Sequence, residues 1–439
     1  MVPPSNILVL GGGIAGIAVA LALSKNLSPL NPDLKITVYE LREVPSTAGG
    51  AINLTPAAQR HLAKLGVLEE LDKMGPDGGV DVDGIEYYSI HSGRKMGYVD
   101  FAGKHGQGYG GYKGRRMMRI CLHLAMLAVA EKAGNISIQF GKKVIGGTET
   151  EKGVTIFFAD KTSATGDLAV GCDGVHSNTR TKIVDPGKAS QYTGISFIQT
   201  TIQTDQIASP IHFKATAMNR SRRGALLTTY CDLEKTEVFV AGLVEIDSSL
   251  LSNDSWRQEG TGSFRPRWTP LKALQDDVRG RFGDSVIPCI REIVEKAEGW
   301  SIYPVYQLVP GGKWFTERIV LIGDAAHAMP PRDESAAYAL DDAILLARVL
   351  ALYYDQPLRE AFQTYDDVRR KPINEAYKDS VAGWANNKDH SKWASRLEEW
   401  LTPWQLRRKK RARVGAWVFD AHSVEIPPPR KWKQVTEWP

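Results

Sequence analysis

The stretch NILVLGGGIAGIAVALALSKN at residues 6–26 decides the fold of this chain. Residues 6–10 form a short apolar run of the kind that makes a buried parallel strand. A glycine-rich turn follows, and apolar residues then recur at helical spacing. A second strand-like segment, KITVYE, occupies residues 35–40. Together these segments predict a strand–helix–strand unit, and therefore an α/β protein.

The glycines of the turn stand at the spacing GxGxxG, as Gly11, Gly13 and Gly16. In this context Gly11 permits a tight turn, Gly13 lets the backbone approach a pyrophosphate, and Gly16 lets the helix pack closely on the strand. Ile14 and Ala15 open the helix, whose free N–H groups and positive dipole end favour phosphates. The turn therefore predicts a dinucleotide site.

Glu40 ends the second strand, 24 residues after Gly16, where a carboxylate can bind ribose hydroxyls. The plain alternative is a glycine turn in an ordinary α/β core, with Glu40 as a solvated strand end. The strand–turn–helix context favours the dinucleotide site. The motif by itself does not distinguish FAD from NAD.

Length and composition set wider limits. The 439 residues suffice for two or three domains, since an average domain holds about 150. The apolar fraction of 43% and the charged fraction of 24% exclude a mainly disordered, collagen-like or coiled-coil chain. No apolar run approaches the ~18 residues of a membrane-spanning helix, and we expect no signal peptide. Four scattered cysteines do not suggest a disulfide framework, so we expect a cytoplasmic location.

Two later motifs narrow the function, VGCDGVHSNTR at residues 170–180 and RIVLIGDAAHAMPP at residues 318–331. With the first glycine motif, and in this order, they resemble the fingerprints of the FAD-dependent aromatic hydroxylases. These are single-component flavoprotein monooxygenases of the salicylate and para-hydroxybenzoate hydroxylase type. The resemblance extends from residue 6 to about residue 350. PPRDESAAYALDDA at residues 330–343 looks most like a branch common among fungal secondary-metabolite monooxygenases.

The resemblance implies a Rossmann-like FAD-binding domain with an inserted antiparallel β-sheet substrate domain and a helical C-terminal region. Alternating Thr, Val, Phe and Tyr residues between about 190 and 242 predict the antiparallel sheet. Helices are expected over residues 53–71, 116–134 and 341–354. We predict FAD-binding parts at 1–75, 113–188 and 301–356, substrate-domain strands at 76–112, a substrate-binding sheet domain at 189–300, and a helical, basic, Trp-rich region at 357–439.

The later motifs supply further cofactor contacts through the resemblance. Asp324 matches the acid that meets the ribose–pyrophosphate region of FAD, and Asp173 with Gly174 matches a motif linked to both FAD and NAD(P)H use. The plain alternatives are a turn for Asp173 and a surface charge for Arg180. For His327 a structural role is favoured over that of a base or metal ligand, because no second His lies at ligand spacing.

Two segments are similar to those that contact the flavin in this family. Arg119 stands at the start of a long helix, like the family arginine that contacts FAD, and the nearby Arg115 and Arg116 leave that assignment open. Gly50 and Ala51, within GGAINLTP, match the segment beside the isoalloxazine ring.

The chain departs from the family just after the prolines of the third motif. Relatives carry glycines there, where the backbone approaches the flavin, whereas residues 332–337 of this chain contain none, and Ala337 takes one such place. Asp333 or Ser335 can cap the following helix, which is the favoured interpretation. The alternative is that Asp333 or Glu334 places an acid near the flavin and alters its reactivity.

The reaction implied by the resemblance has two halves. NADPH or NADH reduces the FAD and leaves, and O2 then gives a flavin C4a-hydroperoxide that transfers one oxygen atom to an electron-rich aromatic or alkenyl substrate by hydroxylation or epoxidation. The single dinucleotide motif suggests transient binding of the nicotinamide. A flavin-dependent oxidase or reductase of the same fold, and a catalytically silent flavin-binding protein, stay as alternatives.

No amino-acid nucleophile is required by this chemistry, but a phenol has a pKa near ~10, and a protein group can help it to ionise. Tyr230, His212, Tyr303 and Tyr306 are the candidates from the sheet and its return strand. A packing role is the favoured alternative for each of them. The residues leave the substrate unidentified within the aromatic, polyketide and alkaloid classes.

The C-terminal region carries an uneven share of the charge. The whole chain has a net charge of +5. Residues 400–439 contain nine Lys/Arg and three Asp/Glu, which is a net charge of +6. The rest of the chain is therefore close to neutral and does not suggest nucleic-acid binding. A basic run at 407–413 is flanked by Trp400, Trp404 and Trp417. Such a segment can lie on an anionic membrane surface. The favoured interpretation is a solvated helix face whose tryptophans pack on the body.

Overall fold

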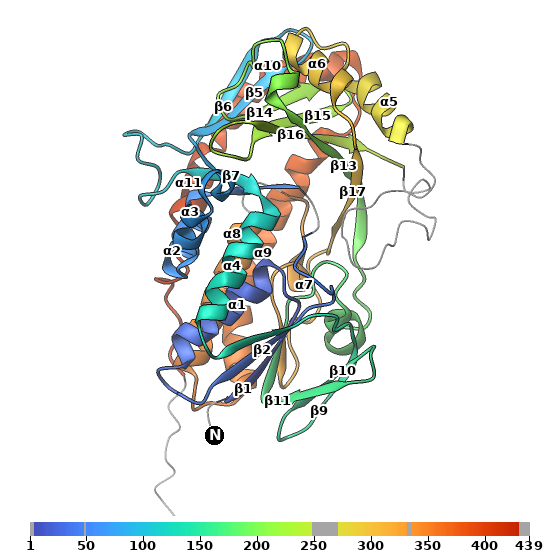
Figure 1. The fold of residues 1–439 in the computed structure, drawn as a ribbon. Helices are drawn as coiled ribbons and strands as arrows, with labels where there is room; N and C mark the ends of the chain where they lie inside the picture. Colours follow the sequence, from blue (N-terminus) through green and yellow to red (C-terminus); the bar gives the residue numbers. More distant parts are fainter. Residues whose placement is uncertain (1–3, 48–49, 248–270, 332–334, 430–439) are drawn as a thin grey trace, which may run out of the picture.

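The computed structural model describes residues 4–47, 50–247, 271–331 and 335–429. Figure 1 shows a parallel sheet toward one end of the molecule and a large, mainly antiparallel sheet toward the other, with long helices running between them. Among the described residues, none of the helices is both long and apolar enough to cross a bilayer.

The parallel sheet has five strands, and β1 is its central strand. Every residue of β1 after Asn6 is buried, as expected for a parallel strand covered on both faces. Helix α1 (Ile14–Leu27) is buried along most of its length and packs against α8. The strands lie in the order β18 (Ile319–Leu321), β12 (Leu168–Gly171), β1 (Asn6–Leu10), β2 (Lys35–Tyr39) and β8 (Ile136–Gln139).

The large sheet has seven strands and confirms the predicted antiparallel sheet. All of its neighbouring strands pair antiparallel except β14 and β5, which pair in parallel. One face packs on the helices α5 (Leu271–Phe282) and α6 (Pro288–Lys296). The strands lie in the order β17 (Ser301–Gln307), β13 (Gln191–Gln203), β16 (Glu237–Glu245), β15 (Gly224–Tyr230), β14 (Thr216–Ser221), β5 (Gly84–Ser89) and β6 (Lys95–Asp100).

The remaining strands form two small antiparallel sheets. One contains β11 (Ser163–Gly166), β10 (Val154–Phe158) and β9 (Val144–Glu149), and the other contains β3 (Ala51–Leu54), β7 (Gly114–Met118) and β4 (Val80–Val82). The remaining α-helices are α2 (Pro56–Lys64), α3 (Val67–Lys73), α4 (Arg119–Lys132), α7 (Asp324–His327), α8 (Ser335–Leu352), α9 (Leu358–Trp384), α10 (Lys392–Arg408) and α11 (Lys410–Val418).

The prediction of one helix over residues 53–71 was wrong at both its start and its middle. Asn53 and Leu54 belong to β3, and the first helix begins only after Thr55, whose hydroxyl accepts a hydrogen bond from the N–H of Ala58 at 3.3 Å. Thr at the N-cap followed by Pro56 at the first position is a strong start signal. Gly66, with a φ of +82°, then separates α2 from α3.

The expected helix boundaries near residues 116 and 341 also shift. Arg116 lies in β7, and α4 begins at Arg119, because hydrogen bonds between β7 and β3 keep the intervening residues extended. Helix α8 begins at Ser335, six positions before the predicted start at Asp341.

Candidate active site

The glycine turn between β1 and α1 has the shape that a pyrophosphate requires. Gly11 has a φ of +110°, which L side chains rarely adopt, and a Cβ on Gly16 would lie 1.8 Å from the carbonyl oxygen of Gly11. A Cβ on Gly13, by contrast, would meet no protein atom within 4 Å. The first and third glycines are thus needed for packing, whereas Gly13 borders open space at the helix N-terminus, which fits a bound phosphate.

Glu40 and His123 hold this turn from two sides. A carboxylate oxygen of Glu40 accepts a hydrogen bond from the N–H of Gly12 at 2.6 Å, and its other oxygen accepts one from the N–H of Arg42 at 3.0 Å. The Nε2 atom of His123, on α4, lies 2.6 Å from the carbonyl oxygen of Gly12. Burial lowers the pKa of His123, so the imidazole is neutral and donates its N–H. Sequence reasoning missed His123, because nothing local links it to a turn 111 residues away.

Asp173 organises the segment after β12. Its carboxylate accepts hydrogen bonds from the hydroxyl of Ser177, and from the N–H and hydroxyl of Thr179 at 2.9 and 3.0 Å. Burial raises the pKa of Asp173, and these donors partly offset the effect. Gly174 has a φ of +77°, as a tight turn requires. The carboxylate of Asp173 therefore shapes its own loop.

Arg180 joins this segment to the third motif, and the alternative of a surface charge was wrong. Its guanidinium is buried and donates to the carbonyl oxygens of Val175 at 2.6 Å, Lys188 at 2.9 Å and Ala325 at 2.8 Å. Because Ala325 lies in α7, Arg180 fixes the segment at Asp173 and Gly174, here called the DG segment, against the turn at Gly323 and Asp324, here called the GD turn.

The GD turn itself leaves Asp324 exposed at the start of α7. Gly323 adopts φ +58° and ψ −143°, a conformation essentially restricted to glycine. A Cβ there would approach the Cβ of Ala15 in α1 to 3.1 Å, so the GD turn and the glycine turn meet. This contact places Asp324 near the N-terminal turn of α1, and its contact with FAD stays a prediction.

A buried ion-pair network behind the GD turn was not predicted. One carboxylate oxygen of Asp342 accepts from the N–H of Gly323 at 2.8 Å and from Nε2 of His327 at 2.6 Å, and the other accepts from Nε of Arg369 at 2.5 Å. Burial would raise the pKa of Asp342, but His327 and Arg369 outweigh it and lower this pKa to about 2. His327 is therefore placed in a structural network, on α7, opposite α8 and α9.

A second group of side chains lies where β3 and β7 face the large sheet. Ala51 and Met118, opposite each other in the β3–β7 pair, pack against Phe239 of β16 and Cys231, the residue that follows β15. A Cβ on Gly50 would lie 2.1 Å from the ring of Phe239, so this glycine allows the close approach. Gly50 and Ala51, predicted to lie beside the flavin, thus stand where the β3–β7 sheet meets the large sheet.

Asn53 and Arg116 share that face, since they lie two residues from Ala51 and Met118 on their strands and pair with each other. Both side chains are buried. Neither the Oδ1 nor the Nδ2 atom of Asn53 has a hydrogen-bond partner among the described residues. A buried amide without partners is costly and rare in native proteins. Asn53 thus fits a donor–acceptor contact to a bound cofactor or substrate.

We expect Asn53→Leu to weaken ligand binding without lowering the stability of the FAD-free protein. Removal of two unsatisfied polar atoms should leave the protein without FAD as stable as the wild type, or more stable by about 1–3 kcal/mol. FAD binding or turnover should fall about tenfold or more. Thermal unfolding of the FAD-free protein and FAD titration measure the two effects.

Asn219→Leu is the matched control, because Asn219 is equally buried but bonds to His212, Leu226 and Thr228. This control should lose stability whether or not FAD is bound. A loss of stability without FAD in Asn53→Leu, with unchanged FAD binding and turnover, would contradict the assignment.

The near face of the large sheet, defined as the face toward β3 and β7, is apolar and aromatic. Tyr303 lies on it beside Phe197, and its electrostatic neighbours include Arg119 and Asp324. Burial raises the pKa of Tyr303, so the phenol is neutral. The side chains of this face are Phe197, Leu227, Cys231, Phe239, Ala241 and Tyr303, together with Trp384 of α9.

The candidates His212 and Tyr230 lie on the opposite side of this sheet. His212 bonds to Asn219 at 2.7 Å and contacts Cys289 of α6 at 3.1 Å, while Tyr230 packs on Phe213. Tyr306 packs on Tyr192 and His176, beside the DG segment. The structure therefore brings Tyr303, and not His212 or Tyr230, toward the predicted flavin side.

Residues 332–334, with Asp333 and Glu334, lie outside the described residues, so their capping or electrostatic role stays a prediction. Ala337 is buried in the first turn of α8.

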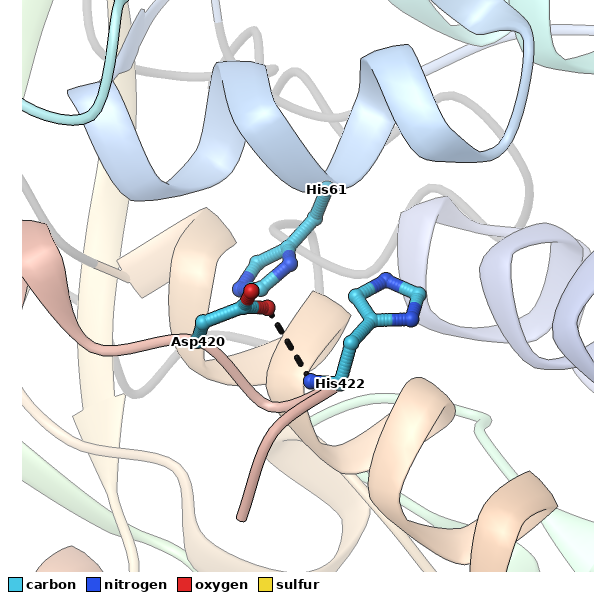
Figure 2. Close-up of side chains that lie close together, drawn as sticks. All are labelled: His61, Asp420 and His422. Carbon is cyan, nitrogen blue, oxygen red and sulfur yellow. Dashed lines mark hydrogen bonds between the residues drawn. The ribbon is translucent and has the colours of Figure 1, made fainter.

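The segment after α11 is fastened to α2 and α8. Lys64 pairs with Asp420 at 2.8 Å, and Arg348 donates to the carbonyl oxygen of Ala421 at 2.6 Å. Figure 2 shows Asp420 and His422 gathered beside His61, whose Nε2 lies 2.8 Å from a carboxylate oxygen of Asp341.

These three residues are of metal-ligating types, and their potential ligand atoms lie within 4.8 Å of one another. However, Lys64 and Arg348 act on His422, and Lys64 already occupies the carboxylate of Asp420. Burial and the charge of Lys64 lower the pKa of His422 to about 4. The positive charges of Lys64 and Arg348 beside these residues disfavour the binding of a divalent cation. We therefore assign the cluster to anchoring the C-terminal segment.

Comparisons with known proteins agree with this arrangement. A family model described as an FAD binding domain matches residues 5–380. The 3-amino-4-hydroxybenzoate 2-monooxygenase PtnB3 of Streptomyces platensis is 26% identical over 85% of this chain and 86% of its own length.

Two solved structures share the fold. HpxO of Klebsiella pneumoniae, complexed with FAD and uric acid, has a TM-score of 0.74 at 20% identity, covering 94% of this chain and 95% of its own. A salicylate hydroxylase substrate complex has a TM-score of 0.71 at 22% identity, covering 95% and 96%. These likenesses confirm the α/β fold with a Rossmann-like sheet, an inserted antiparallel sheet and C-terminal helices. The chain belongs to the FAD-binding domain family matched over residues 5–380, and it is an FAD-dependent monooxygenase of the aromatic hydroxylase type.

Proposed function

We propose that the protein uses NADPH or NADH and O2 to insert one oxygen atom into an electron-rich ring, or an alkenyl group, of a small molecule that carries an acidic oxygen. The observation that carries this proposal is the combination of an aromatic near face with Asn53 and Arg116 opposite it. An apolar wall can hold a planar ring, and a buried guanidinium can balance a phenolate or carboxylate.

The charge of Arg116 supports the acidic class. Burial raises the pKa of Cys231 to about 12, and Arg116 is the group that opposes this rise. Arg116 therefore lies close enough to the near face to act on a group bound there. Similar proteins named for hydroxybenzoate or salicylate, or complexed with uric acid, support the same class, because these rings carry acidic oxygens.

In this proposal FAD and the surrounding side chains have separate roles in the reaction. FAD, when bound along the glycine turn and the GD turn, supplies the transfer of electrons and the activation of O2. The near face excludes water and holds the ring, and Asn53 and Arg116 orient its polar edge. Tyr303, as a neutral phenol, can donate a hydrogen bond to an anionic oxygen.

We further propose a role in secondary metabolism, on the likeness of residues 330–343 to the fungal secondary-metabolite branch. Biosynthetic genes beside the gene for this protein would support that role, and genes of ring catabolism would contradict it.

The experiment compares NADPH and NADH oxidation by the FAD-loaded protein with pairs of hydroxybenzoates and their methyl esters, under ¹⁸O₂. We expect the free acids to stimulate oxidation at least about tenfold more than the esters, because the ester lacks the charge that Arg116 balances. The hydroxylated product should contain one ¹⁸O atom.

Each alternative gives a different result. An oxidase or reductase would consume the nicotinamide without ¹⁸O in any product and release the equivalents as hydrogen peroxide. A silent flavin-binding protein would show no substrate-stimulated oxidation. Equal stimulation by acids and esters, with ¹⁸O in the product, would retain the monooxygenase and contradict the acidic substrate class.

A further inference from the structure

Helix α10 carries a strip of large apolar side chains on the side that faces solvent. Trp393, Leu397, Trp400 and Trp404 are 80%, 57%, 73% and 58% exposed. Their spacing of four, three and four residues places them within about 60° of one another around the helix. They form one continuous strip, here called the tryptophan strip. The prediction that Trp400 and Trp404 pack on the body was wrong, and only Trp417 is buried as expected.

The opposite face of α10 packs on the large sheet, mainly on β6, and combines polar side chains with Leu406. Ser395 and Thr402 are buried on it. Glu398 pairs with Arg220 of β14, and Glu399 accepts a hydrogen bond from Ser89 of β5. These contacts fix the orientation of the helix, so the strip cannot turn inward without breaking them. A large exposed apolar strip of this kind marks an interaction site.

Positive charge surrounds the strip. The guanidinium of Arg396 lies 5.9 Å from the ring centre of Trp393, and that of Arg408 lies 5.3 Å from the ring centre of Trp404. The two acids of the helix point toward the protein, so they do not offset this charge at the surface. The exposed cations of α10 and the start of α11 are Lys392, Arg396, Arg407, Arg408, Lys409, Lys410 and Arg411.

A cavity of about 630 Å³ adjoins the end of the strip, between β6 and the two helices. Arg407, Lys410, Arg413 and Lys95 line it, together with apolar side chains and Asp100. Lys95 pairs with Glu86, and Lys410 lies 3.9 Å from Asp100. The remaining cations of the lining, Arg407 and Arg413, suit an anionic headgroup.

We propose that the tryptophan strip and its cations are a docking surface for an anionic membrane, on which α10 lies parallel to the bilayer. Tryptophan rings favour the region between headgroups and acyl chains, and flanking Arg and Lys side chains reach the lipid phosphates. Self-association through the strip would bring cations of both copies together, so a second copy of the chain fits this surface less well. The proposal is independent of the proposed substrate class.

The test uses the full-length, FAD-loaded protein with vesicles of phosphatidylcholine alone, or of phosphatidylcholine with phosphatidylserine. We expect sedimentation with the anionic vesicles at low salt, loss of sedimentation at high salt, and no binding to phosphatidylcholine alone. Tryptophan fluorescence should shift to the blue on binding, and brominated acyl chains should quench it, because the strip enters the bilayer surface.

Two variants test the two parts of the surface. Trp400→Ser with Trp404→Ser should weaken partitioning about 100-fold or more, because each ring loses its apolar burial. Arg407, Arg408, Lys409 and Lys410 all changed to Gln should weaken it by a similar factor, because each cation adds several-fold near an anionic surface. The matched control is Leu233→Ser with Val44→Ser, which removes equally exposed apolar side chains outside the strip and should change nothing.

Flavin absorbance checks that each variant is folded, since FAD binds in a different part of the chain. Failure of the wild-type protein to bind anionic vesicles at low salt would overturn the proposal. So would a dimer in sedimentation velocity that the tryptophan variant alone abolishes, because that result identifies a second copy as the occupant. Salt-insensitive binding would contradict the role of the cations.

Discussion

Gly13→Val should fold normally and lose FAD. A Cβ at Gly13 meets no protein atom within 4 Å, and its φ of −75° suits any residue, so the protein itself tolerates the side chain. The added methyl groups would instead occupy the space at the N-terminus of α1 where the pyrophosphate approaches the backbone. We expect FAD affinity to fall about 100-fold or more, with activity at background. Visible flavin absorbance of the purified protein and FAD titration measure this loss.

Gly146→Val is the control for that change. Gly146 lies in β9, and a Cβ there also meets nothing within 4 Å, so a valine adds the same bulk away from the proposed site. This variant should keep its FAD. A Gly13→Val protein with full flavin occupancy would refute the assignment of the glycine turn to the pyrophosphate.

Asp342→Asn should strongly destabilise the folded protein. Asp342 is fully buried between His327 and Arg369 and also accepts the N–H of Gly323. Removal of its charge breaks the buried pair with Arg369 and leaves this guanidinium with Asp341, at 3.3 Å, as its remaining acid, and breaking a buried ion pair costs about 3–5 kcal/mol. Because Gly323 precedes Asp324, FAD should also be held less tightly. Urea unfolding followed by flavin release and by far-UV circular dichroism measures both effects.

The pH dependence of this effect has a defined sign. The folded-state pKa of Asp342 is lowered from 3.8 to about 2, so its stabilising effect is complete above about pH 4 and is lost as the pH falls toward 2. The difference between the wild type and Asp342→Asn should therefore shrink over that interval. Asp367→Asn, at an exposed position of α9, is the control and should change stability by less than about 0.5 kcal/mol. Equal stability of Asp342→Asn and the wild type at neutral pH would contradict this role.

Local requirements explain which parts of the site the sequence could predict. Gly11 and Gly323 need a backbone conformation that other residues rarely adopt, and Gly16 needs a missing Cβ, so each requirement selects glycine at its own position. Regular apolar periods then placed the strands and helices around these turns. The order of three such motifs was enough to predict an FAD-binding fold with an inserted antiparallel sheet.

The contacts of the site were harder to predict, because they join distant segments. His123 meets Gly12 across 111 residues, and Arg180 meets Ala325 across 145. Asn53 gave a helical pattern with its neighbours, but its pairing with Arg116 in β7 made it part of a strand and turned its amide toward the substrate sheet. Tyr230 ends β15 with its side chain on the face that packs against α6. His212 lies in the segment before β14 and reaches the same side through its contacts with Asn219 and Cys289.

Helix α10 shows most clearly that contacts between distant segments cannot be predicted from a local pattern. Its sequence alone determined that the region is basic, helical and rich in tryptophan, because these are properties of composition and local spacing. Which side of α10 faces the protein was decided by the tertiary structure. The carboxylate of Glu398 pairs with Arg220, 178 residues away, and that contact leaves the tryptophans outside. A side chain becomes buried or exposed only when its partners from the rest of the chain arrive, and no local pattern encodes where they lie.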